Sequence, residues 1–245
     1  MGQEKGIVIR KDTEAYMDEL RGWLCRTEGV RLEEMADFFR ARLNEYEDHM
    51  SLWKKAYEYL PSLLPGNART LLDLGCGTGL ELDEILKARP ELSVTGVDLC
   101  RDMLERLSEK HPGVKLICGD YFQEELGEAV YDCAVSFESL HHFGAERKKE
   151  LYAKLCRALK PGGCFIEADY IACCEEEERL LMEACRRKRE QERIQEEQFV
   201  HFDTPLTAEH EMEALRRAGF EQVEMMASIE GATFIRAFRD RQADL

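Results

Sequence analysis

One nine-residue stretch limits the possible folds of this chain more than any other part of the sequence. The run Leu71–Leu74 is apolar except for Asp73, and the residues GCGTG follow it directly at 75–79. A nearly continuous apolar run is typical of a strand that is buried on both faces. Glycines then let the backbone turn sharply and let a ligand approach it closely. We therefore expect a strand, a tight turn and a helix, with a ligand site at the carboxyl edge of a parallel sheet.

Short apolar runs alternate with helical stretches after this motif. The repeated strand–helix order predicts an open, mostly parallel sheet with helices on both faces. The expected strands are Thr70–Leu74, Ser93–Val97, Val114–Cys118, Tyr131–Phe137, Cys164–Ala168, Phe220–Met226 and Thr233–Phe238. The expected helices are Leu80–Ala88, Arg101–Lys110, Glu146–Leu159 and one that Thr207 caps and Gly219 ends.

Two further helical regions flank this pattern. Between Asp12 and Leu64, apolar residues recur at helical spacing in two stripes, and Pro61 and Pro65 end the second stripe. The polar stretch Glu175–Gln198 predicts a helix inserted as a cover over the sheet. We expect residues 1–66 to form an N-terminal helical cover. Residues 67–245 should form an α/β domain with a helical insertion at about 171–205.

The charge balance excludes several classes of partner. Fifty acidic residues stand against 34 Lys and Arg, for a formal net charge of −16. Such a surface repels phosphate backbones and anionic lipid, so nucleic acid is a disfavoured partner. No apolar run reaches the length of about 20 residues that a membrane helix needs, and the first residues have no signal-peptide pattern. We expect a cytoplasmic protein without a membrane segment, and no sequence feature defines an oligomeric state.

The ten cysteines are scattered, with no CxxC pair and no zinc-ligand spacing. They are expected to be reduced thiols, many of them buried, and the sequence predicts no metal site. Cys76 should contribute its backbone to the glycine-rich turn, because no base that could activate its thiol is evident nearby.

Acidic residues at three successive strand ends suggest the chemistry of the ligand. The turn does not match the dinucleotide pattern GxGxxG, because Leu80 occupies the third glycine position. Asp73 before the turn disfavours a phosphate and suits an ammonium or sulfonium group. Asp98 lies where an acid accepts hydrogen bonds from ribose hydroxyls. Asp120, at the third strand end, suits an adenine amino group.

Five elements in order resemble the class I S-adenosylmethionine-dependent methyltransferases, near their small-molecule members and a wobble-uridine tRNA methyltransferase group. They are DLGCGTG at 73–79, VDLC at 97–100, GDYF at 119–122, SFESLHHF at 136–143 and LKPGG at 159–163. The resemblance covers residues 70–168 strongly and the C-terminal strands weakly. It implies a Rossmann-like, doubly wound sheet of seven strands with the last strand antiparallel.

The resemblance also implies which residues bind S-adenosylmethionine. Asp73 and the backbone of Gly75, Cys76 and Gly77 would hold the methionine part, and Phe137 would bring backbone near it. Asp98 would bind the ribose, and Leu99, Met103, Asp120 and Tyr121 would contact the adenine. From the residues themselves, we expect Tyr46 or Trp53 to close over the cofactor, because aromatic faces favour a sulfonium charge.

Candidate catalytic residues follow the fourth strand. A histidine there could take a proton from the methyl acceptor, and His142 is the first choice of base, with Glu138 second. Methyl transfer also proceeds without a protein base, because proximity and alignment supply much of the rate. The candidate walls of the substrate pocket are Tyr16, Trp23, Trp53, Tyr170, His201 and Phe202.

We therefore expect transfer of a methyl group from S-adenosylmethionine to a small molecule. The fourth strand end lacks the Asn/Asp-Pro-Pro-aromatic motif of methyltransferases that act on planar amino groups. Its absence argues against an acceptor of that kind. One alternative is a tRNA wobble-uridine methyltransferase, with a basic track from Arg186–Arg189 and the use of carboxy-S-adenosylmethionine. A second is a non-catalytic sensor of the cofactor. A third is dithiol-metalloid methylation through Cys173 and Cys174.

Overall fold

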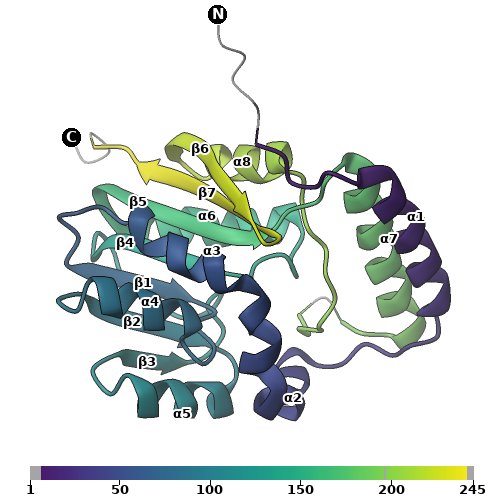
Figure 1. The fold of residues 1–245 in the computed structure, drawn as a ribbon, viewed down its shortest axis with the longest axis horizontal. Helices are drawn as coiled ribbons and strands as arrows, with labels where there is room; N and C mark the ends of the chain where they lie inside the picture. Colours follow the sequence, from purple (N-terminus) through teal and green to yellow (C-terminus); the bar gives the residue numbers. More distant parts are fainter. Residues whose placement is uncertain (1–6, 196, 242–245) are drawn as a thin grey trace, which may run out of the picture.

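A seven-stranded sheet forms the centre of the molecule in the computed structural model, which describes residues 7–195 and 197–241. The strand order is β3-β2-β1-β4-β5-β7-β6. Strands β1 to β5 pair in parallel, and β7 is antiparallel to both β5 and β6, as expected (Figure 1). The strands are β1 (Thr70–Leu74), β2 (Ser93–Asp98), β3 (Lys115–Cys118), β4 (Tyr131–Phe137), β5 (Leu159–Tyr170), β6 (Phe220–Ile229) and β7 (Ala232–Arg239). Residues 1–6 of the expected N-terminal helical cover and residues 242–245 of the expected α/β domain lie outside the described residues.

Both faces of the sheet are buried, which explains the apolar runs. Alternate residues of a strand face opposite sides, and Leu71 packs among residues of α4 and α5 while Leu72 packs among residues of α6 and α8. The helix layers on both faces, predicted from the strand–helix order, are therefore confirmed, as is the Rossmann-like sheet that the resemblance implies. The helices of these layers are α3 (Lys54–Tyr59), α4 (Leu80–Ala88), α5 (Arg101–Lys110), α6 (Ala145–Ala158) and α8 (Ala208–Arg217), with 3-10 turns at Ser51–Trp53 and Leu60–Leu63.

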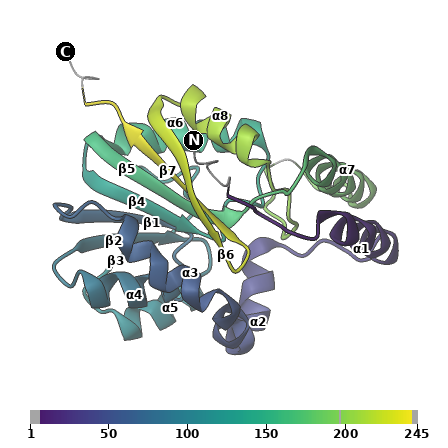
Figure 2. The ribbon, with the colours of Figure 1, turned by 45° about the horizontal axis from the view of Figure 1, so that its top comes forward.

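The first helix and the inserted helix pack on each other beside the sheet. They are α1 (Thr13–Arg26) and α7 (Glu175–Glu192), and Figure 2 shows them side by side. Met17 and Leu20 of α1 share an apolar cluster with Leu181 and Ala184 of α7. Helix α7 ends before the expected Gln198, because the next residue after Glu192 adopts a left-handed conformation with φ 57°.

Helix α2 (Met35–Met50) lies across the carboxyl ends of the strands and closes the site from one side. Arg106 of α5 holds it by donating to the Leu43 carbonyl and the Asn44 side chain. Backbone hydrogen bonds from Met35 to Phe199 and from His201 to Glu33 tie the segment after α7 to the start of α2. Two regions that are distant in sequence therefore meet above the sheet edge.

Among the described residues, no helix combines the length and the apolar character that crossing a bilayer requires.

Candidate active site

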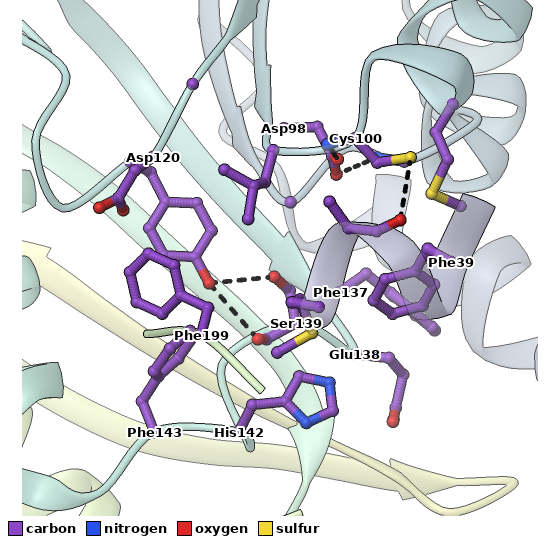
Figure 3. A pocket seen from close by; sticks show the side chains of 18 of the residues that line it. Phe39, Asp98, Cys100, Asp120, Phe137, Glu138, Ser139, His142, Phe143 and Phe199 are labelled. Atoms are coloured by element: carbon purple, nitrogen blue, oxygen red, sulfur yellow. Dashed lines mark hydrogen bonds between the residues drawn. The ribbon is translucent and has the colours of Figure 1, made fainter. Parts of the chain in front are cut away.

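An inner cavity lies at the carboxyl ends of β1, β2 and β4 (Figure 3). The turn after β1 has glycines at two positions that disfavour a side chain. A Cβ on Gly75 (φ +75°) would lie 2.0 Å from Ser139 Oγ, and Gly77 has a φ of +46°, which residues with a Cβ rarely adopt. The glycines therefore leave bare backbone facing the cavity. Nine residues expected to bind the cofactor line it: Tyr46, Gly75, Gly77, Asp98, Leu99, Met103, Asp120, Tyr121 and Phe137.

Asp98 is fixed at the end of β2 by its own backbone surroundings. Its Oδ2 accepts a hydrogen bond from the Gly77 amide at 2.9 Å, and its Oδ1 accepts one from the Cys100 amide at 2.7 Å. Each carboxylate oxygen keeps lone-pair capacity for a second donor. Burial raises the pKa of Asp98, and the two donated bonds counter this effect. The arrangement orients an acceptor for a pair of hydroxyl groups.

Asp73 and Cys76 do not line the inner cavity. Asp73 is fully buried and neither of its carboxylate oxygens has a hydrogen-bond partner among the described residues, but the Glu81 carboxyl of α4 lies beside it. Burial raises the pKa of Asp73 to about 7 and that of Glu81 well above its usual range. The Cys76 side chain packs against Gly96 behind the turn. Sequence reasoning missed Glu81, although an acid in the first turn of this helix was visible.

A second, outer cavity of about 710 Å³ adjoins the inner one. Aromatic and polar side chains from α2, the fourth strand end and the segment after α7 line it, and they include four of the six histidines of the chain. The two cavities share four residues. These are Phe39, Tyr46, Glu138 and His142. These residues therefore lie at the boundary between the two cavities.

Glu138 occupies a strained position at this junction. Its φ of +47° is unusual for a residue with a side chain, and such strain costs on the order of 1–3 kcal/mol. Its amide donates to the Ala168 carbonyl at 2.8 Å, which holds the backbone against β5. Its Oε1 is buried without a hydrogen-bond partner among the described residues. Burial raises the pKa of this carboxyl to about 8, so it is largely protonated at neutral pH.

A cluster of histidines and carboxylates lies next to Glu138. His141 Nδ1 is 2.5 Å from Asp169 Oδ1, and His141 Nε2 is 3.5 Å from Asp203 Oδ1. Burial lowers the pKa of His141, but these two carboxylates outweigh it and hold the pKa well above its usual value. Burial and the neighbouring His141 lower the pKa of His142. Burial, aided by His142, also lowers that of His201, to about 4.

The residues expected to form the substrate pocket divide into two groups. Trp53, Tyr170 and His201 line the outer cavity. Tyr16 lies behind this wall, with its hydroxyl 2.7 Å from that of Tyr170, and it lines neither cavity. Trp23 lies further out, 40% exposed and next to Phe202, and neither of these two residues lines the inner or the outer cavity.

Several residues of the two cavities were not expected from the sequence. Phe39, Ser139, Phe143 and Phe199 line the inner cavity, and Asp203 lines the outer one. The signal for Ser139 and Phe143 was present in the stretch after the fourth strand. Nothing in the sequence pattern placed Phe199 or Asp203 here.

The chemistry of the inner cavity's lining suits S-adenosylmethionine. It offers bare backbone, an oriented carboxylate at Asp98 and aromatic rings, and no Lys or Arg is among its described lining residues. This set suits a cationic ligand with ribose hydroxyls and disfavours a pyrophosphate. The sheet order and the position of this cavity define the class I methyltransferase fold.

Comparison with known proteins agrees with this class. The methyltransferase-domain family model matches residues 71–163. A malonyl–acyl-carrier-protein O-methyltransferase of Halalkalibacterium halodurans is 35% identical over 105 residues, which are 40% of this chain and 38% of that protein. A mouse (Mus musculus) tRNA (carboxymethyluridine(34)-5-O)-methyltransferase is 29% identical over 126 residues, 49% of this chain and 18% of that protein. Residues 71–163 of this chain therefore match a methyltransferase domain, in agreement with the sheet order described above.

A solved structure extends the likeness of the fold beyond the matched segment. Human N-acetylserotonin methyltransferase in complex with S-adenosylmethionine superposes with a TM-score of 0.65 at 18% identity, covering 91% of this chain and 65% of that chain. The matches to the curated relatives span well under two thirds of those proteins, 38% and 18% in the two cases above.

Proposed function

We propose that this protein transfers a methyl group from S-adenosylmethionine, bound in the inner cavity, to a small molecule in the outer cavity. The observation that carries this proposal is the shared boundary of the two cavities at Tyr46, Glu138 and His142. Two adjoining compartments with a common wall allow two ligands to meet at one point, and alignment of reactants supplies much of the rate of such a displacement.

The chain supplies binding and alignment around a cofactor that carries an electrophilic methyl group on a sulfonium centre. We assign the ribose hydroxyls to Asp98, the adenine to Leu99 and Tyr121, and the methionine part to the backbone of Gly75 and Gly77. The Tyr46 ring would cover the sulfonium, because the face of an aromatic ring attracts a cation. Asp73 would act on the methionine part from behind the turn.

Glu138 and His142 are the residues placed to contact the acceptor. His142 remains the first choice of proton acceptor, because its lowered pKa leaves the imidazole neutral. The acceptor itself is expected to combine an apolar body with a hydrogen-bond acceptor. Phe38 and Tyr170 offer ring surface in the outer cavity, and the Trp53 indole N–H is buried without a partner among the described residues.

The tRNA alternative finds no support in the basic run of α7. Lys188 is buried and donates to the carbonyls of Thr27, Glu28 and Val30. Arg186 pairs with Glu190, and Arg189 donates to carbonyls in the turn after the helix. Lys188 therefore docks α1 and Arg189 closes a turn, which leaves two exposed arginines of the run, and the net charge of −16 opposes a polyanion.

The metalloid alternative is weakened in the same way. Cys173 and Cys174 pack with the α1–α7 cluster and line neither cavity. Burial, with Glu177 nearby, raises the pKa of the Cys173 thiol to about 12, which disfavours the thiolate.

Cytoplasmic location stays a prediction from the sequence.

Calorimetry with S-adenosylmethionine and S-adenosylhomocysteine tests the cofactor site. The wild-type protein should bind both ligands, and Asp98→Ala should weaken each by 10-fold or more, because it removes the acceptor for the ribose hydroxyls. Glu105→Gln, which changes an exposed acid on α5, should bind like the wild type. Equal affinity of Asp98→Ala and wild type would remove Asp98 from the site.

Product formation separates an enzyme from a sensor. Wild-type protein with methyl-labelled S-adenosylmethionine should transfer label to a compound in a metabolite extract, and His142→Gln should reduce the transfer while cofactor affinity is kept. Binding without transfer to any fraction would favour the sensor.

A further inference from the structure

The strongest unexplained feature of the molecule is the cluster of His141, His142 and Asp203 on the wall of the outer cavity. One ligand-type atom from each residue lies within 4.8 Å of the others. Asp203 Oδ1 is 3.2 Å from His142 Nδ1 and 3.5 Å from His141 Nε2. Bonds of about 2.1 Å to a divalent ion place its ligand atoms about 3.0–3.4 Å apart. Two of the three spacings therefore lie in this range or next to it, as expected for ligands that could draw together around one ion.

The hydrogen bonding of the cluster is incomplete in a way that an ion would complete. Asp203 Oδ1 is buried, yet it has no hydrogen-bond partner of good geometry among the described residues. Buried polar atoms are normally satisfied, and His141 Nε2 approaches this oxygen only to 3.5 Å, so the Asp203 carboxylate beside two imidazoles indicates a missing partner.

Asp169 gives His141 the support that metal-binding histidines usually have. The carboxylate, 1% exposed, contacts Nδ1 and leaves Nε2 directed at Asp203. A carboxylate on the far nitrogen fixes the tautomer and the ring orientation of a metal ligand. The backbone amides of Leu140 and Tyr170 both donate to Asp169, so the carboxylate is itself held in place.

We propose that His141 Nε2, His142 and Asp203 bind one divalent first-row transition ion, such as Zn²⁺ or Fe²⁺. Two imidazoles and one carboxylate are a ligand set for such ions and leave positions open. Binding requires His141 to release its Nε2 proton to solvent, and His142 Nδ1 to give up its long contact, 3.3 Å, with the Phe202 carbonyl. The open positions face the outer cavity, where an oxygen or nitrogen of the acceptor would complete the coordination.

This inference rests on the ligand geometry and not on methyl transfer, so the two proposals can fail separately. The sequence predicted no metal site, because the cysteines lack ligand spacing and because Asp203 is far from His141 and His142 along the chain. Only the fold brings the three together.

Titration of tag-free, chelator-treated protein with Co²⁺ tests the site, followed by visible absorption and the metal content after dialysis. We expect one ion per chain without a thiolate charge-transfer band. Asp203→Asn and His142→Gln should each weaken binding at least 10-fold, and Asp169→Asn about 10-fold, as an outer partner does.

Two controls keep the result specific to this cluster. His49→Gln changes a histidine of the same cavity that is not in the cluster, and Cys173→Ser/Cys174→Ser removes the paired thiols; both variants should keep the ion. Circular dichroism checks that each variant folds. The proposal is wrong if the wild type takes up no stoichiometric ion, if folded Asp203→Asn binds as tightly as the wild type, or if the cysteine variant loses the ion. If His142→Gln loses methyl transfer but keeps the ion, His142 acts as a base and is not a ligand of the ion.

Discussion

Gly75 is the residue at which the backbone conformation and the ligand site depend most directly on each other. Its φ of +75° is one that residues with a Cβ rarely adopt, and a Cβ would lie 2.0 Å from Ser139 Oγ. Gly75→Ala should therefore weaken S-adenosylmethionine binding by 10-fold or more, since the strain costs on the order of 1–3 kcal/mol and the loop must move. Isothermal titration calorimetry measures the change.

Two companion variants make the Gly75 prediction specific. Gly113→Ala should leave the affinity unchanged, because a Cβ there would meet nothing within 4 Å. The double variant Gly75→Ala/Ser139→Gly should recover part of the loss, since it removes both Ser139 atoms that the new Cβ would meet, Oγ at 2.0 Å and Cβ at 2.5 Å, but not the strained φ. An unchanged affinity of Gly75→Ala would contradict the close approach of this turn to the ligand.

The sequence pattern predicted the cavity-lining residues at strand ends. It did not predict those that lie in irregular loops. Asp98, Asp120 and Tyr121 line the inner cavity because parallel strands end at one edge. Asp73 also ends a strand, but it lies on the same face as Leu71, towards α4, and does not line the inner cavity, so its action on the ligand stays a prediction. Asp203 belongs to an irregular segment after α7, and no periodicity indicates where such a segment packs.

Among the elements, β1 and β4 are tied together at the end of the sheet opposite the site. Asp132 of β4 accepts hydrogen bonds from the Arg69 and Thr70 amides, each at 2.9 Å, and from Lys160 Nζ at 2.8 Å. Burial raises the pKa of Asp132, but the Lys160 ammonium and the donated bonds outweigh it and lower the pKa to about 2. A folded-state pKa below the unfolded value stabilises the protein at neutral pH and loses this effect as the pH falls.

Asp132→Asn should therefore lower the free energy of unfolding by about 1 kcal/mol at pH 7, a value reduced by solvent screening. The difference from the wild type should shrink as the pH falls from about 4 towards 2, where the wild-type carboxylate is itself protonated. Urea unfolding at several pH values measures both. Glu109→Gln, an exposed acid on α5, should show no such trend. A difference that stays constant with pH would assign the effect to packing instead of charge.

The ends of helices were predictable where a local residue type sets them, and not where tertiary contacts do. Thr207 caps α8 and Gly219 ends it with φ +103°, as their residue types indicated. The inserted helix was expected to run to Gln198, but its end is set by tertiary contacts: Arg189 donates to the Gln195 carbonyl, and the following backbone pairs with the start of α2. Local propensity does not encode such contacts.

Across the whole molecule, a buried charged network joins two helices to the strand that supports the site. Lys148 of α6 contacts Glu211 of α8 and lies 3.6 Å from Glu167 of β5, and all three side chains are fully buried. The Tyr152 hydroxyl donates to Glu167 at 2.9 Å. Glu167 is two residues before Asp169 on the same face of β5. The network therefore fixes the strand that orients His141.

Lys148→Met should destabilise the protein by about 3–5 kcal/mol, because it leaves two carboxyl groups buried without their cation. Urea unfolding measures this loss, and it should be smaller at low pH, where protonation neutralises those carboxyls. Lys149→Met, on the exposed face of the same helix, should change stability by less than about 0.5 kcal/mol. Because the penalty lies in the uncompensated charge, Lys148→Met/Glu211→Gln should be more stable than Lys148→Met alone. If the double variant were no more stable, the loss would reflect packing around the Lys148 stem, and the network would owe its stability to volume and not to charge.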